Sequence, residues 1–529
     1  MADISKFSVV DPRIVQQKPK YAVEKGALSI TNSTFQAIAS SASQQTFQIQ
    51  VPSENVFVDR AVDWLVTASA DITVNYGVAP GANLVLATPG TNFSLAPLPT
   101  SQCVSTMMAS INDQTVSINM SDVLPQVLRL SDMAKTRKQR TCPTMLDKYA
   151  SVQNATTVFN SPVGSYESAY DTADVGNGAW SDVTFTAGTN TALNGAGLPV
   201  TVAGQTAFTF RVTWTTCEKL VLPPFIFSDE DELSTGLFGV QNIQFTMNFN
   251  QPSRAFRFLP LTLGGQAPTG QSCVWASGGN LPFSQAKVQA QFLTPSLDVP
   301  LPAKSVVPYM EFPRYIGNST IVDPAANKLI QSQTITLPNI PDLLIIYVKP
   351  QTYADSSVCD WTMPVQKISI SFDNFSGLLS SHSAYELYKM SVNNGLDMDW
   401  SDWSGSAWVA GTKRALVGGP LVLRPGRDFA LSTGQAPGLV GNFTLQFDLT
   451  VDNSTLAYGG AVSIYTIAAN SGFFETIRGS SRIVKGVVTE TDILAAPVQE
   501  VPQSLERMVG EGKHKAHVGR KSGMAGYTR

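Results

Sequence analysis

The sequence predicts an all-β protein that contains two copies of one β-domain in tandem, with a few short helices. Three observations lead to this prediction: short segments of alternating apolar and polar residues, frequent glycine and proline, and landmarks that occur twice in the same order. The length of 529 residues also indicates more than one domain, because a single hydrophobic core rarely serves so long a chain.

The strand predictions rest on a period of two residues. Successive side chains of a strand point to opposite faces, so a half-buried strand alternates apolar and polar residues. The 39 glycines and 32 prolines are typical of sandwiches and barrels with many turns. The clearest alternation occurs in residues 47–51, 208–214, 243–249, 368–372 and 443–451.

Helical patterns are few and short. Residues 121–135 and 383–392 carry apolar side chains at roughly helical spacing, and each segment predicts a helix. The rest of the chain favours strands and turns.

Three pairs of landmarks indicate the duplication. Each half contains a strand, a proline corner and a buried strand; then a strand that precedes a helix; then a glycine-led strand. In the first half these are residues 46–66, 111–113 and 236–249, and in the second half residues 334–348, 370–374 and 438–449. The shared order predicts two copies of one domain.

The two copies differ in the length of their loops. Residues 151–205 are rich in Gly, Ala, Ser and Thr and predict a long loop insertion, which in a compact domain is functional or mobile. The expected divisions are an N-terminal arm (1–26), the first domain (27–255), a linker (256–302), the second domain (303–479) and a C-terminal basic tail (480–529).

Composition limits the classes of function. The chain is 43% apolar but only 14% charged, against roughly 25% in ordinary soluble domains, which suits a surface that partners will cover. The net charge of −4 argues against a chain devoted mainly to nucleic-acid binding. Residues 507–529 are an exception, with one acid and six basic residues: Arg507, Lys513, Lys515, Arg520, Lys521 and Arg529.

Cysteine use and targeting patterns indicate a reducing compartment. The five cysteines are scattered and contain no CxxC pair, so we expect neither a disulfide framework nor a zinc site. The first residues lack an apolar stretch of signal-peptide length, and no apolar run is long enough to cross a membrane.

Candidate catalytic and metal-binding residues are sparse. His382 is the only histidine within a domain, and its surroundings resemble a loop between a strand and a helix more than a Ser-His-Asp site. His514 and His517 lie in the basic tail, where a solvated segment is favoured over a metal site.

Two acidic clusters are further candidates for a binding or catalytic site. Residues 229–232 lack the alternating ligands and central glycine of a calcium loop, and a solvated turn is favoured. Residues 397–402, with Trp400, Trp403 and Trp408, fit a sugar platform and fit aromatic rings buried at a contact equally well. No phosphate or dinucleotide fingerprint appears. We therefore predict no catalytic, cofactor-binding or metal residues, no cofactor and no enzymatic activity.

Several segments resemble the major capsid proteins of polinton-like viruses, adintoviruses and virophages, members of the double jelly-roll group. The resemblance covers most of residues 45–65, 220–250 and 330–470. It rests on residues 332–349, 368–379, 385–388, 393–395, 419–421, 424–428 and 431–438, with residues 51–55, 57–60 and 234–237 in the first half.

The resemblance implies two eight-stranded jelly rolls side by side, and a homotrimer that forms a pseudo-hexameric capsomer of an icosahedral shell around double-stranded DNA. It implies neighbouring capsomers, minor capsid and penton proteins as partners, and no small-molecule substrate. Residues 151–205 would face outward. The basic tail would face inward, toward an internal membrane or genomic DNA. The protein would reside in the virion after folding in the host cytoplasm or nucleus.

Other classes of protein share parts of this pattern. A carbohydrate- or receptor-binding β-protein such as a viral spike would share the composition and the tryptophan-rich segment. A penton usually needs one jelly roll, and a β-sandwich glycoside hydrolase needs two carboxylates across a cleft. The tandem landmarks favour the major capsid protein.

Overall fold

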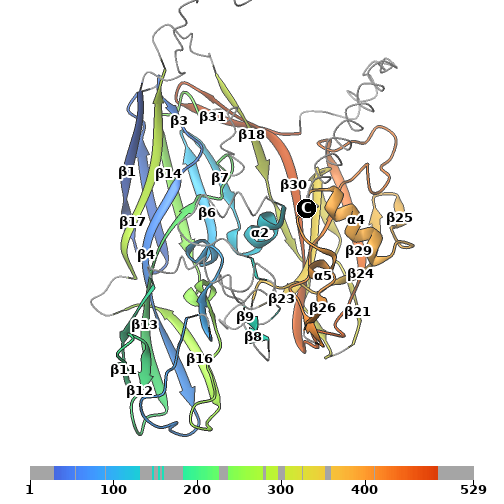
Figure 1. Ribbon diagram of the computed structural model, residues 1–529. Helices are drawn as coiled ribbons and strands as arrows, with labels where there is room; N and C mark the ends of the chain where they lie inside the picture. The colour runs from blue at the N-terminus through green and yellow to red at the C-terminus, as the bar shows by residue number, and fades with distance from the viewer. Residues whose placement is uncertain are drawn as a thin grey trace, which may run out of the picture.

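Strands dominate the computed structural model, as the sequence predicts, and they form two β-sandwiches side by side (Figure 1). The structure describes residues 29–53, 55–89, 91–130, 146–147, 150, 153–154, 158–159, 183–225, 236–277, 282–295, 304–324, 326–351, 359–409 and 411–486.

The first sandwich uses eight main strands in two four-stranded sets. One set has the order β1-β17-β4-β13 and the other has the order β2-β14-β6-β7. Strand β1 pairs with both β17 and β2, so the two sets are continuous at this edge. The strands are β1 (Ser29–Ser40), β2 (Gln44–Gln50), β4 (Asp63–Tyr76), β6 (Val104–Ile111), β7 (Gln114–Ile118), β13 (Ala207–Lys219), β14 (Asn242–Phe249) and β17 (Phe283–Thr294).

The second sandwich repeats this pairing pattern. Its sets have the orders β18-β30-β23-β28 and β22-β29-β24-β25. Strand for strand, in chain order, these match the first sandwich, and the pattern is that of the jelly roll. The double jelly roll is thereby confirmed. The strands are β18 (Ser305–Glu311), β22 (Ile335–Asn339), β23 (Leu343–Pro350), β24 (Val365–Phe372), β25 (Phe375–Leu378), β28 (Leu421–Leu423), β29 (Val440–Val451) and β30 (Gly460–Ile477).

Shorter elements complete the described fold. The second predicted helix is confirmed as α4 (Ala384–Asn393), which follows β25. The first is confirmed in its N-terminal part as α2 (Met120–Val127), which follows β7, whereas its predicted end, residues 131–135, lies outside the described residues. The others are β3 (Phe57–Val58), β5 (Phe93–Leu95), α1 (Pro99–Gln102), η1 (Leu128–Leu130), β8 (Gln153–Asn154), β9 (Val158–Phe159), η3 (Pro252–Ala255), β19 (Arg314–Ile316), β20 (Thr320–Val322), β21 (Lys328–Gln331), α5 (Trp400–Trp403), β26 (Ser406–Val409) and β27 (Thr412–Ala415). No helix among the described residues is long and apolar enough to cross a membrane.

The core of each jelly roll lies between its two sheets. In the first jelly roll, Phe47, Trp64 and Phe245 are fully buried, and they come from β2, β4 and β14. Along β4 and β13 the buried side chains alternate with partly exposed ones, which is the two-residue period seen in the sequence.

The expected linker, residues 256–302, is wrong over most of its length. Strands β15 (Phe256–Phe258), β16 (Pro268–Trp275) and β17 all pair with strands of the first jelly roll. Within this segment, Gly264 and Gly265 form a tight turn, since both have positive φ between the paired residues Leu263 and Gln266. The first jelly roll therefore extends to residue 294.

Two other expected boundaries also move. Residues 480–484 were assigned to the tail, but they form strand β31 (Ser480–Val484), which pairs with the end of β30. Residues 183–201 were assigned to a loop, but they form β10 (Val183–Ala187), β11 (Thr191–Leu193) and β12 (Pro199–Thr201). β11 and β12 lie at one end of the first jelly roll, at the lower left of Figure 1. The N-terminal arm and residues 160–182 lie outside the described residues.

The two jelly rolls have the same kind of hydrogen bond at the turn after the fourth of their eight main strands, β6 and β24. Asn112 and Asp373 both adopt left-handed φ, of 53° and 47°. The Asn112 Oδ1 accepts from the amide of Gln241 at 2.8 Å, and the Asp373 Oδ1 accepts from the amide of Thr444 at 2.8 Å. Each side chain thus ties the turn to the neighbouring strand or to the residue that leads into it.

We expect Asp373→Ala to lower the free energy of unfolding by about 2 kcal/mol, because alanine loses the hydrogen bond and is strained at left-handed φ. Asp373→Gly loses only the hydrogen bond and should cost about 1 kcal/mol. Urea unfolding of both variants measures the difference. Equal losses would show that backbone strain plays no part at this turn.

Candidate functional site

Charged side chains are buried where the two jelly rolls meet. A carboxylate of the second jelly roll, Asp360, lies between Arg254 and Arg257 of the first, with Nη2–Oδ distances of 2.9 and 3.2 Å. The side chains of all three are less than a tenth exposed. Gln102 of α1 also donates to Asp360, at 2.8 Å. Nearly every polar contact of this carboxylate therefore crosses between the two jelly rolls.

A second carboxylate extends this network. Arg257 also binds Asp147 at 2.7 Å, and the backbone amide of Asp360 donates to Asp147 at 3.0 Å. The guanidinium of Arg129, which belongs to η1, donates to the backbone oxygen of Asp360 at 3.2 Å. The network thus fixes both the side chain and the backbone of Asp360.

The arginines control ionisation here. Burial by itself would raise the pKa of Asp360, but Arg254, Arg257, Lys349 and Arg129 outweigh it and hold the pKa below its usual value. Burial would also lower the pKa of Arg257, and the nearby carboxylates outweigh it in turn and raise that pKa. Asp360 is therefore ionised at neutral pH, in a site that compensates its charge.

A neighbouring group of charges joins α2 to the second jelly roll. Asp122 of α2 accepts from Lys349 at 2.6 Å and pairs with Arg314, while its backbone oxygen accepts from the Tyr347 hydroxyl at 2.6 Å. The Lys349 ammonium also lies 4.5 Å from the centroid of the Tyr465 ring. Burial lowers the pKa of Lys349 well below its usual value.

A second contact zone lies at the other end of the junction, near the top of Figure 1, where β31 meets β7. Asp113 accepts from the amide of Ser481 at 2.6 Å, and Asn112 donates to the hydroxyl of Ser481 at 2.9 Å. The hydroxyl of Thr476 also donates to the backbone oxygen of Phe238. Contacts at two separated places hold the two jelly rolls in one relative orientation.

Most candidate residues from the sequence do not form a site in the described part of the chain. The basic residues 507–529, His514, His517 and the acidic cluster 229–232 lie outside the described residues. The described residues contain no cluster of three or more His, Cys, Asp or Glu placed to hold a metal ion.

His382 lies in the turn between β25 and α4, as the sequence predicts. Its Nδ1 has no hydrogen-bond partner among the described residues. The adjacent Ser383 is the N-cap of α4, where its hydroxyl and amide both bind Glu386. The serine therefore serves the helix, and this geometry does not form a catalytic triad.

The tryptophans of the 397–408 segment divide between core and surface. Trp403 is fully buried and donates to the backbone oxygen of Pro420 at 2.9 Å. Trp400 stacks on it with ring centroids 5.7 Å apart and is 39% exposed, while Trp408 is 71% exposed. Packing within the second jelly roll thus accounts for Trp403 and for one face of Trp400.

The junction network is the feature that sequence reasoning missed. Its signals are faint: Lys349 ends the apolar run of β23, and Arg254 and Arg257 flank the aromatic Phe256. Charged residues are rarely buried without partners, so a charged residue inside an apolar segment indicates a buried ion pair.

Comparison with known proteins decides the family. Residues 2–293 match the family described as Sputnik virophage major capsid protein 1st domain, and residues 312–472 match the major capsid protein V20 C-terminal domain. The first match alone covers more than half of the chain. The chain belongs to the virophage major capsid protein family.

One relative is similar in sequence, and two solved structures are similar in fold. The capsid protein V20 of Sputnik virophage is 25% identical over 514 residues, which cover 94% of this chain and 82% of that protein. A chain of the Sputnik virophage structure solved by cryo-EM matches with a TM-score of 0.74 at 24% identity, covering 95% of this chain and 98% of the other. The mavirus major capsid protein matches with a TM-score of 0.70 at 13% identity, covering 94% and 99%.

Family membership decides between the interpretations that the sequence left open. This virophage major capsid protein is a structural component of the virion shell, and its family is not a class of enzymes. The spike, penton and glycoside hydrolase alternatives lose their support.

We expect Asp360→Asn to destabilise the capsid protein by about 3–5 kcal/mol at pH 7, because Arg254 and Arg257 would each lose a buried carboxylate partner. The folded-state pKa of Asp360 is lowered, so its contribution is present above the unfolded-state pKa of about 3.9 and is lost as the pH falls through the folded value. The variant should therefore lose less stability than the wild type below about pH 4.

Urea unfolding between pH 7 and pH 3 measures both effects. Asp323→Asn is the matched control, because it removes an exposed carboxylate of the second jelly roll. Equal free energies of unfolding for the two variants at pH 7 would contradict a structural role for the Asp360 ion pairs.

Proposed function

We propose that three copies of this capsid protein form a pseudo-hexameric capsomer of an icosahedral shell that encloses a double-stranded DNA genome. The observation that carries the proposal is the repeat of one eight-stranded pairing pattern in both jelly rolls. Three chains with two similar units each present six similar units around a threefold axis. That arrangement suits a hexagonal lattice.

The junction supports this assembly. A capsomer keeps its outline only if the two jelly rolls of each chain keep one relative orientation. The buried ion pairs of Asp360 and the contacts of Asp113 with β31 supply this constraint at two places. The low content of charged residues, 14%, also suits a chain whose surface is covered by neighbouring copies. Obligate interfaces of this kind bury roughly 2,000 Å² or more.

The resemblance to capsid proteins also suggests roles for the basic tail and the insertion. The basic tail, with a net charge of about +5 over residues 507–529, faces inward toward genomic DNA or an internal membrane, where anionic groups neutralise it. Residues 151–205 face outward. Neighbouring capsomers, minor capsid proteins and pentons contact the outer edge of the capsomer.

We expect the purified protein to have a solution mass of about 170 kDa by light scattering, which is three chains of 56.7 kDa. Electron microscopy of the same peak should show particles with a hexagonal outline. A stable monomer that forms no arrays at high protein concentration would contradict the trimer.

We also expect neutralisation of the tail to reduce genome retention while capsomers still form. The test variant replaces the six basic residues of 507–529 with glutamine, and the control exchanges Lys and Arg at the same positions, so that charge is kept. Because phosphate contacts weaken as salt rises, the difference should shrink at high ionic strength. DNA content per particle is the measurement, and equal DNA content in both variants would contradict an inward, charge-neutralised tail.

A further inference from the structure

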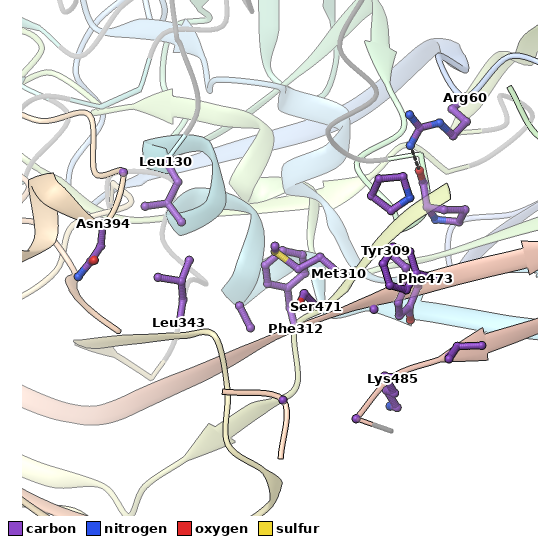
Figure 2. A pocket seen from close by; sticks show the side chains of 18 residues that line it. Arg60, Leu130, Tyr309, Met310, Phe312, Leu343, Asn394, Ser471, Phe473 and Lys485 are labelled. Atoms are coloured by element: carbon purple, nitrogen blue, oxygen red, sulfur yellow. Dashed lines mark hydrogen bonds between the residues drawn. The ribbon is translucent and has the colours of Figure 1, made fainter. Parts of the chain in front are cut away.

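An apolar pocket of about 780 Å³ lies at the junction of the two jelly rolls. Figure 2 shows Met310, Phe312 and Leu343 of the second jelly roll at this pocket, with Leu130 of η1 nearby. Phe473 also lines it and is 55% exposed. Apolar surface of this extent is stabilised when another apolar group covers it, by roughly 25 cal/mol for each Å².

The chain leaves the described structure from the wall of this pocket. β31 ends at Val484, and Lys485 and Gly486 complete the lining. β31 cannot continue along β30, because Asp342 already accepts from the amide of Ser471 at 2.7 Å and donates its own amide to Ala469 at 2.9 Å. The chain must therefore leave the sheet at this point.

Gly486 sets the direction of departure. Its φ of 56° is left-handed, and a Cβ at this position would lie 2.7 Å from Cγ2 of Val440. The next residues thus begin beside the pocket, with 43 residues still to follow.

The residues that follow Gly486 are mostly apolar, as is the pocket. Residues 487–498 contain five aliphatic side chains larger than alanine, two acids and no basic residue. The basic residues of the tail begin only at Arg507. The pocket itself is mostly apolar and has two basic side chains in its wall, Arg60 and Lys485, of which Lys485 pairs with Glu311. The aliphatic residues are Val487, Val488, Ile493, Leu494 and Val498, and the acids are Glu490 and Asp492.

We propose that residues 487–498 fold back into this pocket of their own chain and cover Met310, Leu343 and Phe473. Because the segment starts in the pocket wall, it closes only a short loop, and the entropic cost of closure is small. The segment then acts as a third tie between the jelly rolls and fixes the point from which the basic residues depart. This docking does not depend on the trimer or on DNA.

The test uses a chain that ends at residue 486 and a labelled peptide with the sequence of residues 487–498. The peptide should bind the shortened chain at least ten-fold more tightly than it binds the full chain or a chain that ends at residue 506, because in those two the pocket is already filled. Fluorescence anisotropy is the readout. Absence of binding to the shortened chain, or equal binding to all three chains, would overturn the proposal.

Two substitutions locate the binding site. Phe473→Asp should weaken peptide binding at least ten-fold, and Ile321→Asp should not change it, because Ile321 is 70% exposed on β20 and does not line the pocket. Both positions are more than half exposed, so both variants are expected to fold. Equal affinities would exclude this pocket as the site.

A cysteine pair distinguishes docking within one chain from exchange between copies. Met310→Cys combined with Leu494→Cys in the full chain should give a cross-link that leaves the mass of a single chain on a denaturing gel. Cross-linked dimers would overturn docking within one chain. Since this readout does not need a trimer, its outcome is separate from that of the light-scattering experiment.

Discussion

One buried carboxylate is at the centre of the main contact between the two jelly rolls. Asp360 of the second jelly roll accepts from Arg254, Arg257 and Gln102 of the first, and its own side chain is only 9% exposed. A buried ion pair contributes little net stability compared with apolar packing, but removal of one partner leaves the other charge uncompensated. The network therefore disfavours every arrangement that separates the two domains.

The two jelly rolls contain equivalent helices, but these helices have different surroundings. Helices α2 and α4 follow equivalent strands. All but one residue of α2 is buried, because it lies between the jelly rolls, and Asp122 on it pairs with Lys349. In α4 only Leu387 and Ser391 are buried, and the helix begins with the capping box of a surface helix. The two helices therefore differ in burial because only α2 lies against the other jelly roll.

The contacts at the junction fit the structural role of the family. Its charged groups pair with one another across the two domains, and the side-chain amide of Asn112 both ties a turn to Gln241 and reaches Ser481 of the second jelly roll. These contacts leave an apolar pocket at the junction uncovered, and the chain departs from the wall of this pocket at Gly486.

The sequence by itself determined the fold class, the duplication, the two principal helices and the family resemblance. These features depend on local patterns: a two-residue period along each strand, and turn residues at its ends. Only the tertiary structure decided that residues 256–294 belong to the first jelly roll. A strand of a sheet is distinguished from a linker by its hydrogen bonds to residues far away in the sequence, and the local sequence does not show these. The tertiary structure alone brought Asp360 to Arg254, which lies 106 positions away. Burial of a charge is decided by such distant contacts, and a local pattern carries no record of them.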